Sequence, residues 1–369
     1  YEVTGVQTCA LPIYSATCNV KVYKPFISTW DTQYYSNYTH VVKLPLESGG
    51  SVYYDFYVEW GDGTTSHITS SYQSEVTHYY SAKGVYDVKI YGKLNGFGFS
   101  GSGTEYSENL VDIKQWGDVK LRNQGRQFMN AENLTGFSAP DTLDLSNIDN
   151  MAFMFSGATK FNGNIGSWDV SNVNNMAYMF QNASSFNQDI SSWDVSKVVY
   201  MTKMFYNASS FNQAIGSWNV GSVTDIDYMF YNASAFNQDL NSWNVSNVTR
   251  MDYMFYGATS FNGNISSWVV SNVILMPCMF KNASSFNQNI GSWVVNKVTS
   301  MDSMFSGASK FNQDIGSWNV SNVTDMDMMF YNATDFNQNL ESWVVGGGTS
   351  MLMMFSNSGM AGSLPSWYQ

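Results

Sequence analysis

The fold is decided by a 25-residue unit, and residues 190–215 contain one complete copy, ISSWDVSKVVYMTKMFYNASSFNQAI. The Trp of this unit recurs with a period of 25 through eight units, and its Met and Phe-Asn positions follow in the same register. A period of this length is typical of solenoids, whose turns pack on one another, whereas propeller blades need about 40 residues or more. The eight repeated tryptophans are Trp168, Trp193, Trp218, Trp243, Trp268, Trp293, Trp318 and Trp343.

The pattern of apolar residues changes within each unit. Trp193 and Val195 alternate as in a short strand with two inward side chains. The next apolar residues have the i, i+3, i+4, i+7 spacing of one helix face, and they are Met201, Met204, Phe205 and Ala208. Two residues after each Met-Phe pair only Gly or Asn occurs, which predicts a left-handed backbone that ends the helix. We therefore predict a leucine-rich-repeat-type solenoid with one short parallel strand and one short helix per turn.

The N-terminal region lacks the repeat and is predicted to be a different domain. Alternating apolar residues predict strands over 52–60, 76–80 and 85–90, and Gly61-Asp62-Gly63-Thr64 predicts a tight turn after the first of them. Short strands of this kind favour a small β-sandwich. We interpret Asp62 as a turn residue, with a Ca²⁺ ligand as the alternative. The predicted fold class is thus mixed, an N-terminal β-sandwich followed by a solenoid.

The sequence predicts a division of the chain into four segments. Residues 3–13 look like the in-frame translation of a sequencing adapter, so we expect 1–13 to be an artefact and the true N-terminus, with any export signal, to be missing. An ordinary N-terminal strand is the alternative. The β-sandwich is expected over 14–96 and a junction with a degenerate first repeat over 97–142. The solenoid is expected over 143–369, with an incomplete last turn because Trp367 comes only 24 residues after Trp343.

Composition and charge exclude several function classes. The formal net charge is −12, which disfavours nucleic acid because such binding depends on clustered Lys and Arg. The sequence contains no run of 18 apolar residues, so we expect no membrane span in this fragment. Three Cys and three His leave little material for a disulfide framework or a metal site, so we expect no metal and no cofactor.

The sequence also gives little support for catalysis. All three histidines, His40, His67 and His78, lie in the N-terminal region without a triad-type arrangement, and we expect His78 to serve packing and hydrogen bonding. Asp189 occupies a repeat position that also holds Asn and Ala, so it does not supply the fixed carboxylate pair of a glycosidase. We therefore predict no catalytic residues and no enzymatic activity.

Two motifs resemble known families. Trp60-Gly61-Asp62-Gly63-Thr64, followed by His78 and Tyr80, resembles the polycystic-kidney-disease (PKD) type of β-sandwich domain. The Met-Phe-x-Asn-Ala-Ser-Ser-Phe-Asn-Gln repeats resemble the BspA family of leucine-rich-repeat surface proteins. This resemblance implies a secreted or cell-surface protein without enzymatic activity, with adhesion as the proposed role of some members. The departures from the family pattern are Ile226 for Met, Ala214 for Asp or Asn, and Val269, Val294 and Val344 for Asp or Asn.

Two surfaces are candidates for binding. The first is the outer helical face, because its side chains are expected to point about 150° away from the core stripe. Five tyrosines lie there on three neighbouring turns, and we predict that they form a ligand-binding patch: Tyr206, Tyr228, Tyr231, Tyr253 and Tyr256. Simple coverage of thin helices is the alternative. The second is the strand face, with Ser before each Trp and Asp, Asn or Val after it.

Asparagines recur at two further positions of the unit. We expect the Asn of each Phe-Asn pair, from Asn162 to Asn337, to bond the next turn as a buried ladder, with a repeated ligand site as the alternative. Asn182-Ala183-Ser184 and its equivalents match glycosylation sequons, but Gly replaces this Asn in some units, which favours backbone geometry.

Together these features predict an extracellular or cell-surface protein. The predicted partner is a protein or glycan on another cell surface or matrix, bound through the repeat solenoid. The alternatives are a carbohydrate-binding module and a spacer or stalk module of a larger surface protein.

Overall fold

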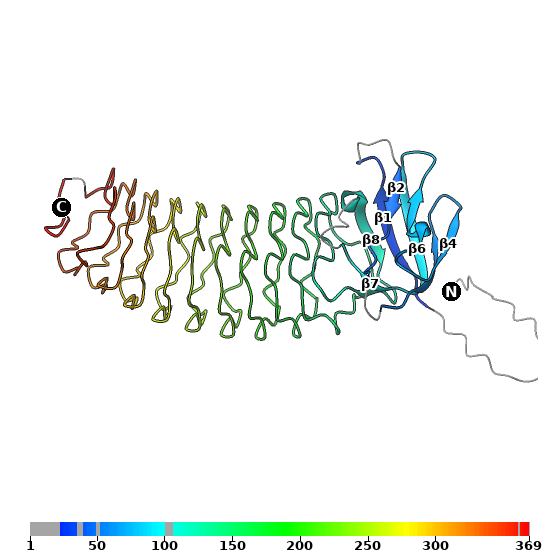
Figure 1. Ribbon diagram of the computed structural model, residues 1–369, viewed down its shortest axis with the longest axis horizontal. Helices are drawn as coiled ribbons and strands as arrows, with labels where there is room; N and C mark the ends of the chain where they lie inside the picture. Colours follow the sequence, from blue (N-terminus) through cyan, green and yellow to red (C-terminus); the bar gives the residue numbers. More distant parts are fainter. Residues whose placement is uncertain (1–22, 35–39, 49–51, 100–105, 361, 369) are drawn as a thin grey trace, which may run out of the picture.

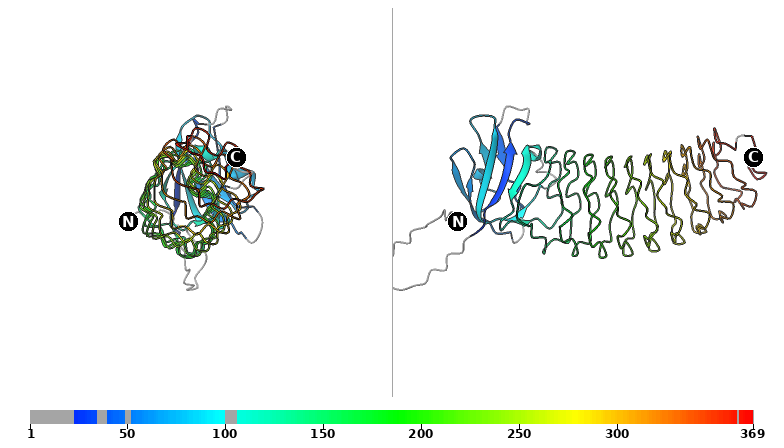
Figure 2. Two further views of the ribbon diagram at one scale, coloured as in Figure 1. Left: turned by 90° about the vertical axis from the view of Figure 1, so that its left-hand side faces the viewer. Right: turned by 180° about the vertical axis from the view of Figure 1, so that it is seen from behind.

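The structure is a computed structural model that describes residues 23–34, 40–48, 52–99, 106–360 and 362–368. The predicted adapter segment, 1–13, lies outside the described residues. A strand-rich domain abuts one end of a long stack of coils (Figure 1), and the coils superimpose on one another when the stack is viewed along its length (Figure 2). One buried apolar cluster runs from Phe26 in the domain to Met360 in the last coil.

The N-terminal domain is built from two antiparallel sheets. The larger has the strand order β4-β3-β6-β1-β8, and β2 pairs with β5 in the smaller. Strand β3 alternates exposed and buried residues, which is why the 52–60 pattern forms a half-buried strand. The bounds are β1 Phe26–Asp31, β2 Val41–Lys43, β3 Asp55–Glu59, β4 Thr65–Ile68, β5 Thr77–Tyr79, β6 Val85–Lys93 and β8 Leu110–Gln115, with 3-10 helices η1 Ser74–Val76 and η2 Ser107–Asn109.

The three strands predicted in this region correspond to β3, β5 and β6. Strand β8 lies in the segment that the sequence assigned to the junction, yet it pairs with β1 at the edge of the larger sheet. The N-terminal sheet therefore takes one strand from beyond residue 96. Nothing in its sequence distinguishes this strand from a degenerate repeat, because its partner β1 lies more than 80 positions earlier.

The N-terminal domain and the array share a continuous seam. Strand β7 (Asn95–Phe97) pairs in parallel with β9 (Lys120–Leu121), which leads into the first coil. The Trp116 ring lies between the rings of Phe26 in the domain and Phe128 in the first coil, with centroid distances of 6.4 and 6.2 Å. The Asp141 carboxylate accepts the backbone N–H groups of Trp116 and Gly117 at 2.9 and 2.8 Å. The domain thus covers the apolar end of the stack.

The coils differ from the predicted strand and helix. Among the described residues there is no α-helix, and the Trp193–Val195 segment is not a strand. The parallel pairing of each coil is a single bridge at the residue before the Met, as in Asn150↔Asn175 and Asn175↔Tyr200. The prediction of one strand and one helix per turn was therefore wrong in detail.

The physical reason is that each coil has two left-handed residues, and neither a helix nor a strand continues through that conformation. The predicted Gly/Asn position is left-handed throughout, which confirms that part of the prediction. A second left-handed position, with φ between 51° and 61°, lies two residues after each Met and was not predicted. Its occupants are Phe153, Tyr178, Lys203, Tyr228, Tyr253, Cys278, Ser303, Met328 and Met353.

Hydrogen bonds alternate along the segment that resembled a helix. Met154 N–H donates to Met151 within the coil at 3.1 Å, as in a β-turn whose third residue is left-handed, whereas Phe153 N–H donates to Ala177 in the next coil at 3.0 Å. Successive turns place apolar residues at the spacing of a helix face while every second N–H joins the neighbouring coil. The spacing of apolar residues alone could not distinguish a helix from this succession of turns.

Side chains join the coils in two further ways. Each repeated Trp stays buried and, from Trp193 on, its indole N–H donates to the Ile or Leu carbonyl 28 residues earlier, as in Trp243 to Ile215 at 2.9 Å. The predicted Asn ladder is confirmed, since the Asn162 Oδ1 accepts the Asn187 N–H at 2.9 Å and this bond recurs up to Asn337. The ladder is half-buried or exposed, however, and not buried as expected.

Candidate functional site

The structure brings the five predicted tyrosines together as one tyrosine patch. Tyr206, Tyr231 and Tyr256 form one stacked column, with ring centroids 4.5 Å apart at each step. Tyr228 and Tyr253 stack at 4.6 Å in a second column beside the first. The columns touch, because Tyr228 lies 5.9 Å from Tyr231.

The stacking of coils, and not a helix, sets this arrangement. Tyr228 and Tyr253 occupy the left-handed position of their coils, and their N–H groups donate to the next coil at 2.8 and 2.9 Å. Tyr231 N–H instead donates to Tyr228 within its own coil at 3.1 Å. Equivalent side chains therefore leave the backbone in the same direction in every coil, one above the other.

The tyrosines are more closely packed than the sequence suggested. All five are half-buried, and each ring covers a face of its neighbour. Burial, together with the neighbouring Tyr206 and Tyr256 hydroxyls, raises the pKa of Tyr231 to about 12. Because the faces inside each stack are covered, most of what the patch offers to a partner is ring edges and hydroxyl groups. The expectation that these side chains lie apart from the packed structure is corrected accordingly.

Cations extend the second column toward the N-terminal domain. The Lys203 ammonium lies 5.3 Å from the Tyr178 ring centroid and 4.8 Å from that of Tyr228, so it is held between two aromatic faces. The Arg126 guanidinium lies over Phe153 in the same way, at 5.3 Å. Sequence reasoning identified Tyr228 and Tyr253 in this column but missed the cation contacts that extend it, because the same position holds Phe, Tyr, Lys, Cys, Ser or Met in different coils.

A buried acidic pair lies beside the patch and was also missed. Asp227 and Asp252 are 6% and 5% exposed, and both pair with the Arg250 guanidinium, which lies 3.0 Å from Asp227 through its Nε. Burial, followed by the carboxylates of Asp252 and Asp225, raises the pKa of Asp227 to about 7. Burial also raises the pKa of Asp252. The residue at this position is also Asp in two other coils, Asp302 and Asp327, and is Ala, Thr, Pro or Leu in the rest, so the repeat pattern does not single out this pair.

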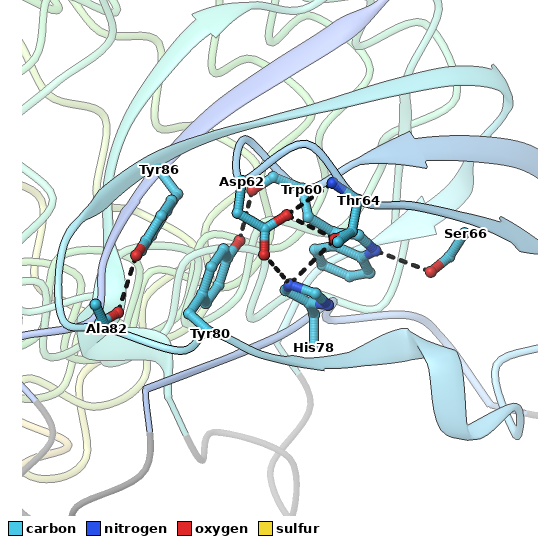
Figure 3. Close-up of polar contacts among 8 residues, drawn as sticks. All are labelled: Trp60, Asp62, Thr64, Ser66, His78, Tyr80, Ala82 and Tyr86. Carbon is cyan, nitrogen blue, oxygen red and sulfur yellow. Dashed lines mark hydrogen bonds and ion pairs between the residues drawn. The ribbon is translucent and has the colours of Figure 1, made fainter.

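The Trp60–Thr64 motif forms a second polar cluster, in the N-terminal domain. His78 Nε2 lies 2.8 Å from an Asp62 oxygen and its ring stacks on Trp60 at 4.7 Å, while Thr64 donates to the other Asp62 oxygen at 2.6 Å (Figure 3). Tyr80 closes the cluster by donating to the Trp60 carbonyl at 2.8 Å. Burial raises the Asp62 pKa, but bonds from Thr64 and His78 outweigh it and lower that pKa to about 2.

This cluster ties the two sheets of the domain together, because Trp60 follows β3 and His78 belongs to β5. The prediction that His78 packs and forms hydrogen bonds is confirmed. Within the described part of the chain, no group of three His, Cys, Asp or Glu side chains is arranged to hold a metal ion. Among the same residues, no helix has the length and apolar character needed to cross a membrane.

The repeats match a family model. Four overlapping stretches, 122–233, 191–283, 210–308 and 264–367, match the family described as Mycoplasma protein of unknown function, DUF285. Together they span 122–367, two thirds of the chain, so the chain belongs to this family and is a repeat protein. No curated protein and no solved structure matches the chain.

Proposed function

We propose that this chain, a member of the DUF285 repeat family, is a non-enzymatic extracellular protein that binds proteins on other cells or matrix through its repeats. The resemblance of the repeats to BspA surface proteins, and of the N-terminal domain to the PKD type, supports this location and an adhesive role. In this proposal the coils form a leucine-rich-type solenoid that carries the binding surface, and the β-sandwich covers its end.

The observation that carries the proposal is the tyrosine patch. Tyrosine is enriched at interfaces because it combines a large apolar ring with a polar edge at a small cost in conformational entropy. Here stacking fixes the rings in advance, which lowers the cost of ordering them on binding. A protein partner fits this surface better than a sugar, because a sugar ring packs on an aromatic face and the faces inside both stacks are covered.

The test removes the hydroxyls and keeps the stacks. Tyr228, Tyr231, Tyr253 and Tyr256 are replaced together by Phe, and binding of the labelled full chain to collagen, fibronectin, laminin and whole cells is measured. Each lost hydrogen bond costs about 0.5–1.5 kcal/mol, so four should weaken binding more than tenfold. The melting temperature should change little, because the ring contacts remain.

Four exposed tyrosines of the N-terminal domain provide a matched control. The same exchange to Phe at Tyr53, Tyr57, Tyr72 and Tyr79, which are 55–78% exposed, should leave binding unchanged. Loss with this control alone would place the site on the domain. Loss with neither variant would favour a spacer or stalk role for the repeats.

A further inference from the structure

A second surface is formed by the residue that follows each repeated Trp, and the type of this residue changes along the array. In five coils the residue after the Trp is Asp or Asn, and its side-chain oxygen accepts the N–H two residues later at 3.0–3.2 Å. In three coils this residue is Val269, Val294 or Val344, which has no acceptor and is 55%, 55% and 71% exposed. These coils lack a local backbone hydrogen bond and expose an apolar side chain instead, and all three lie within the last four Trp units.

An open groove runs over the same four coils. One part, of about 820 Å³, is lined by Asp314, Trp318 and Val344 among others. The adjoining part, of about 590 Å³, reaches back to Ser266 and shares Asp314 and Ser317 with the first. The two parts therefore form one groove along the stack, with a size in the range of ligand sites.

Most polar side chains of the groove present hydrogen-bond acceptors to a ligand. The hydroxyls of Ser292 and Ser317 donate inward to carbonyls of the preceding coil at 3.2 and 2.9 Å, which leaves their lone pairs facing outward. One Asp314 oxygen accepts the Gly316 N–H at 2.9 Å, and the other has no hydrogen-bond partner among the described residues. The side-chain oxygen of Asn289 accepts the Gly291 N–H at 3.1 Å, so the NH₂ group of the same amide is left to donate to a ligand.

The charge of the lining restricts the ligand. Asp314 and Glu341 are its charged residues, and no Lys or Arg lines either part among the described residues. An anionic ligand would be repelled, whereas sugar hydroxyls would donate to the acceptors. The C–H faces of the same sugars would cover Val344, which is the one of the three exposed valines that lines the groove. Because the groove crosses four coils, a ligand that fills it is linear and longer than one or two sugar units.

We propose that this groove binds a neutral linear oligosaccharide, at a site separate from the tyrosine patch. The test is calorimetric titration of the full chain with cellohexaose, maltohexaose and mannohexaose, with their disaccharides, and with a sulfated hexasaccharide. At least one neutral hexasaccharide should bind ten times more tightly than its disaccharide, and the sulfated one should not bind.

The repeat itself supplies the decisive variant. Replacing Val344, the valine that lines the groove, by Asn restores the Asp or Asn residue type found in five other coils, so the melting temperature should stay the same or rise while hexasaccharide affinity falls several-fold. The reverse exchange in the early coils, Asn219→Val with Asn244→Val, should leave that affinity unchanged. The four Tyr→Phe replacements should also leave it unchanged, which separates this site from the proposed adhesive function.

Three outcomes would overturn the proposal. They are no heat of binding with any neutral hexasaccharide, unchanged affinity in the Val→Asn variant, and tighter binding of the sulfated ligand than of the neutral ones.

Discussion

Asp227 shows how a single residue ties the stability of the array to pH. Its pKa of about 7 lies above the ordinary value of 3.8, so the folded chain holds a proton there that the unfolded chain releases between about pH 4 and pH 7. A group with a raised carboxyl pKa makes the folded state less stable as pH rises through that window, at about 1.4 kcal/mol per pKa unit. We expect the wild-type free energy of unfolding to fall between pH 4 and 7 relative to that of Asp227→Asn, whose amide does not titrate.

Denaturant melts of both proteins at several pH values measure this difference. The exposed carboxylate of Asp194 provides the control, and Asp194→Asn should run parallel to the wild type in this window because hydrogen bonds from Ser196 lower the pKa of that carboxyl. Parallel curves for wild type and Asp227→Asn would show that the acidic pair does not retain its proton.

At the scale of the element, the sequence predicts the coil boundaries and the core but not the backbone between them. Trp, Met and Phe recur because each coil buries them against the next, so their period identifies the core directly. The left-handed residue two after each Met has no such mark, since its conformation is imposed by the hydrogen bond to the next coil and not by the side chain. The tyrosine patch could be predicted from the 25-residue register, because equivalent positions lie one above the other. The Arg250–Asp252 pairing and the groove beside Asp314 depend on contacts between coils that the register does not show.

The coil as a unit makes a direct prediction about deletions. Removing Trp243–Ser267 takes out 25 residues and joins equivalent positions, so the remaining coils keep every type of contact between neighbours. This variant should fold, with a melting temperature within a few degrees of the wild type. Removing only Trp243–Met254 leaves a 13-residue coil that cannot follow the circumference of its neighbours, and should lose a large part of the cooperative melt. Circular dichroism of both variants decides between them, and equal damage would contradict the coil register.

At the scale of the whole molecule, the seam between the N-terminal domain and the array decides whether the chain unfolds as one body. Contacts in a stack of repeats reach only nearest neighbours, so cooperativity depends on every interface along the way. The seam rests on Trp116, packed between Phe26 and Phe128, and on the two backbone bonds that Asp141 accepts. Strand β8 makes the connection stiff, because it belongs to the N-terminal sheet and leads directly into Trp116.

We therefore expect Trp116→Ala with Asp141→Ala to uncouple the two parts. Truncating a large buried aromatic costs about 3–5 kcal/mol, and each backbone N–H left without its partner adds about 1–3 kcal/mol. Hydrogen exchange measured by mass spectrometry should then show the amides of β3 and β6 opening at a different denaturant concentration from those of coils beyond residue 200. Trp243→Ala is the matched control, because it removes one Trp inside the array and leaves the seam intact. If the double variant still opened as a single unit, the β7–β9 pairing and the remaining apolar contacts would suffice to couple the domain to the stack.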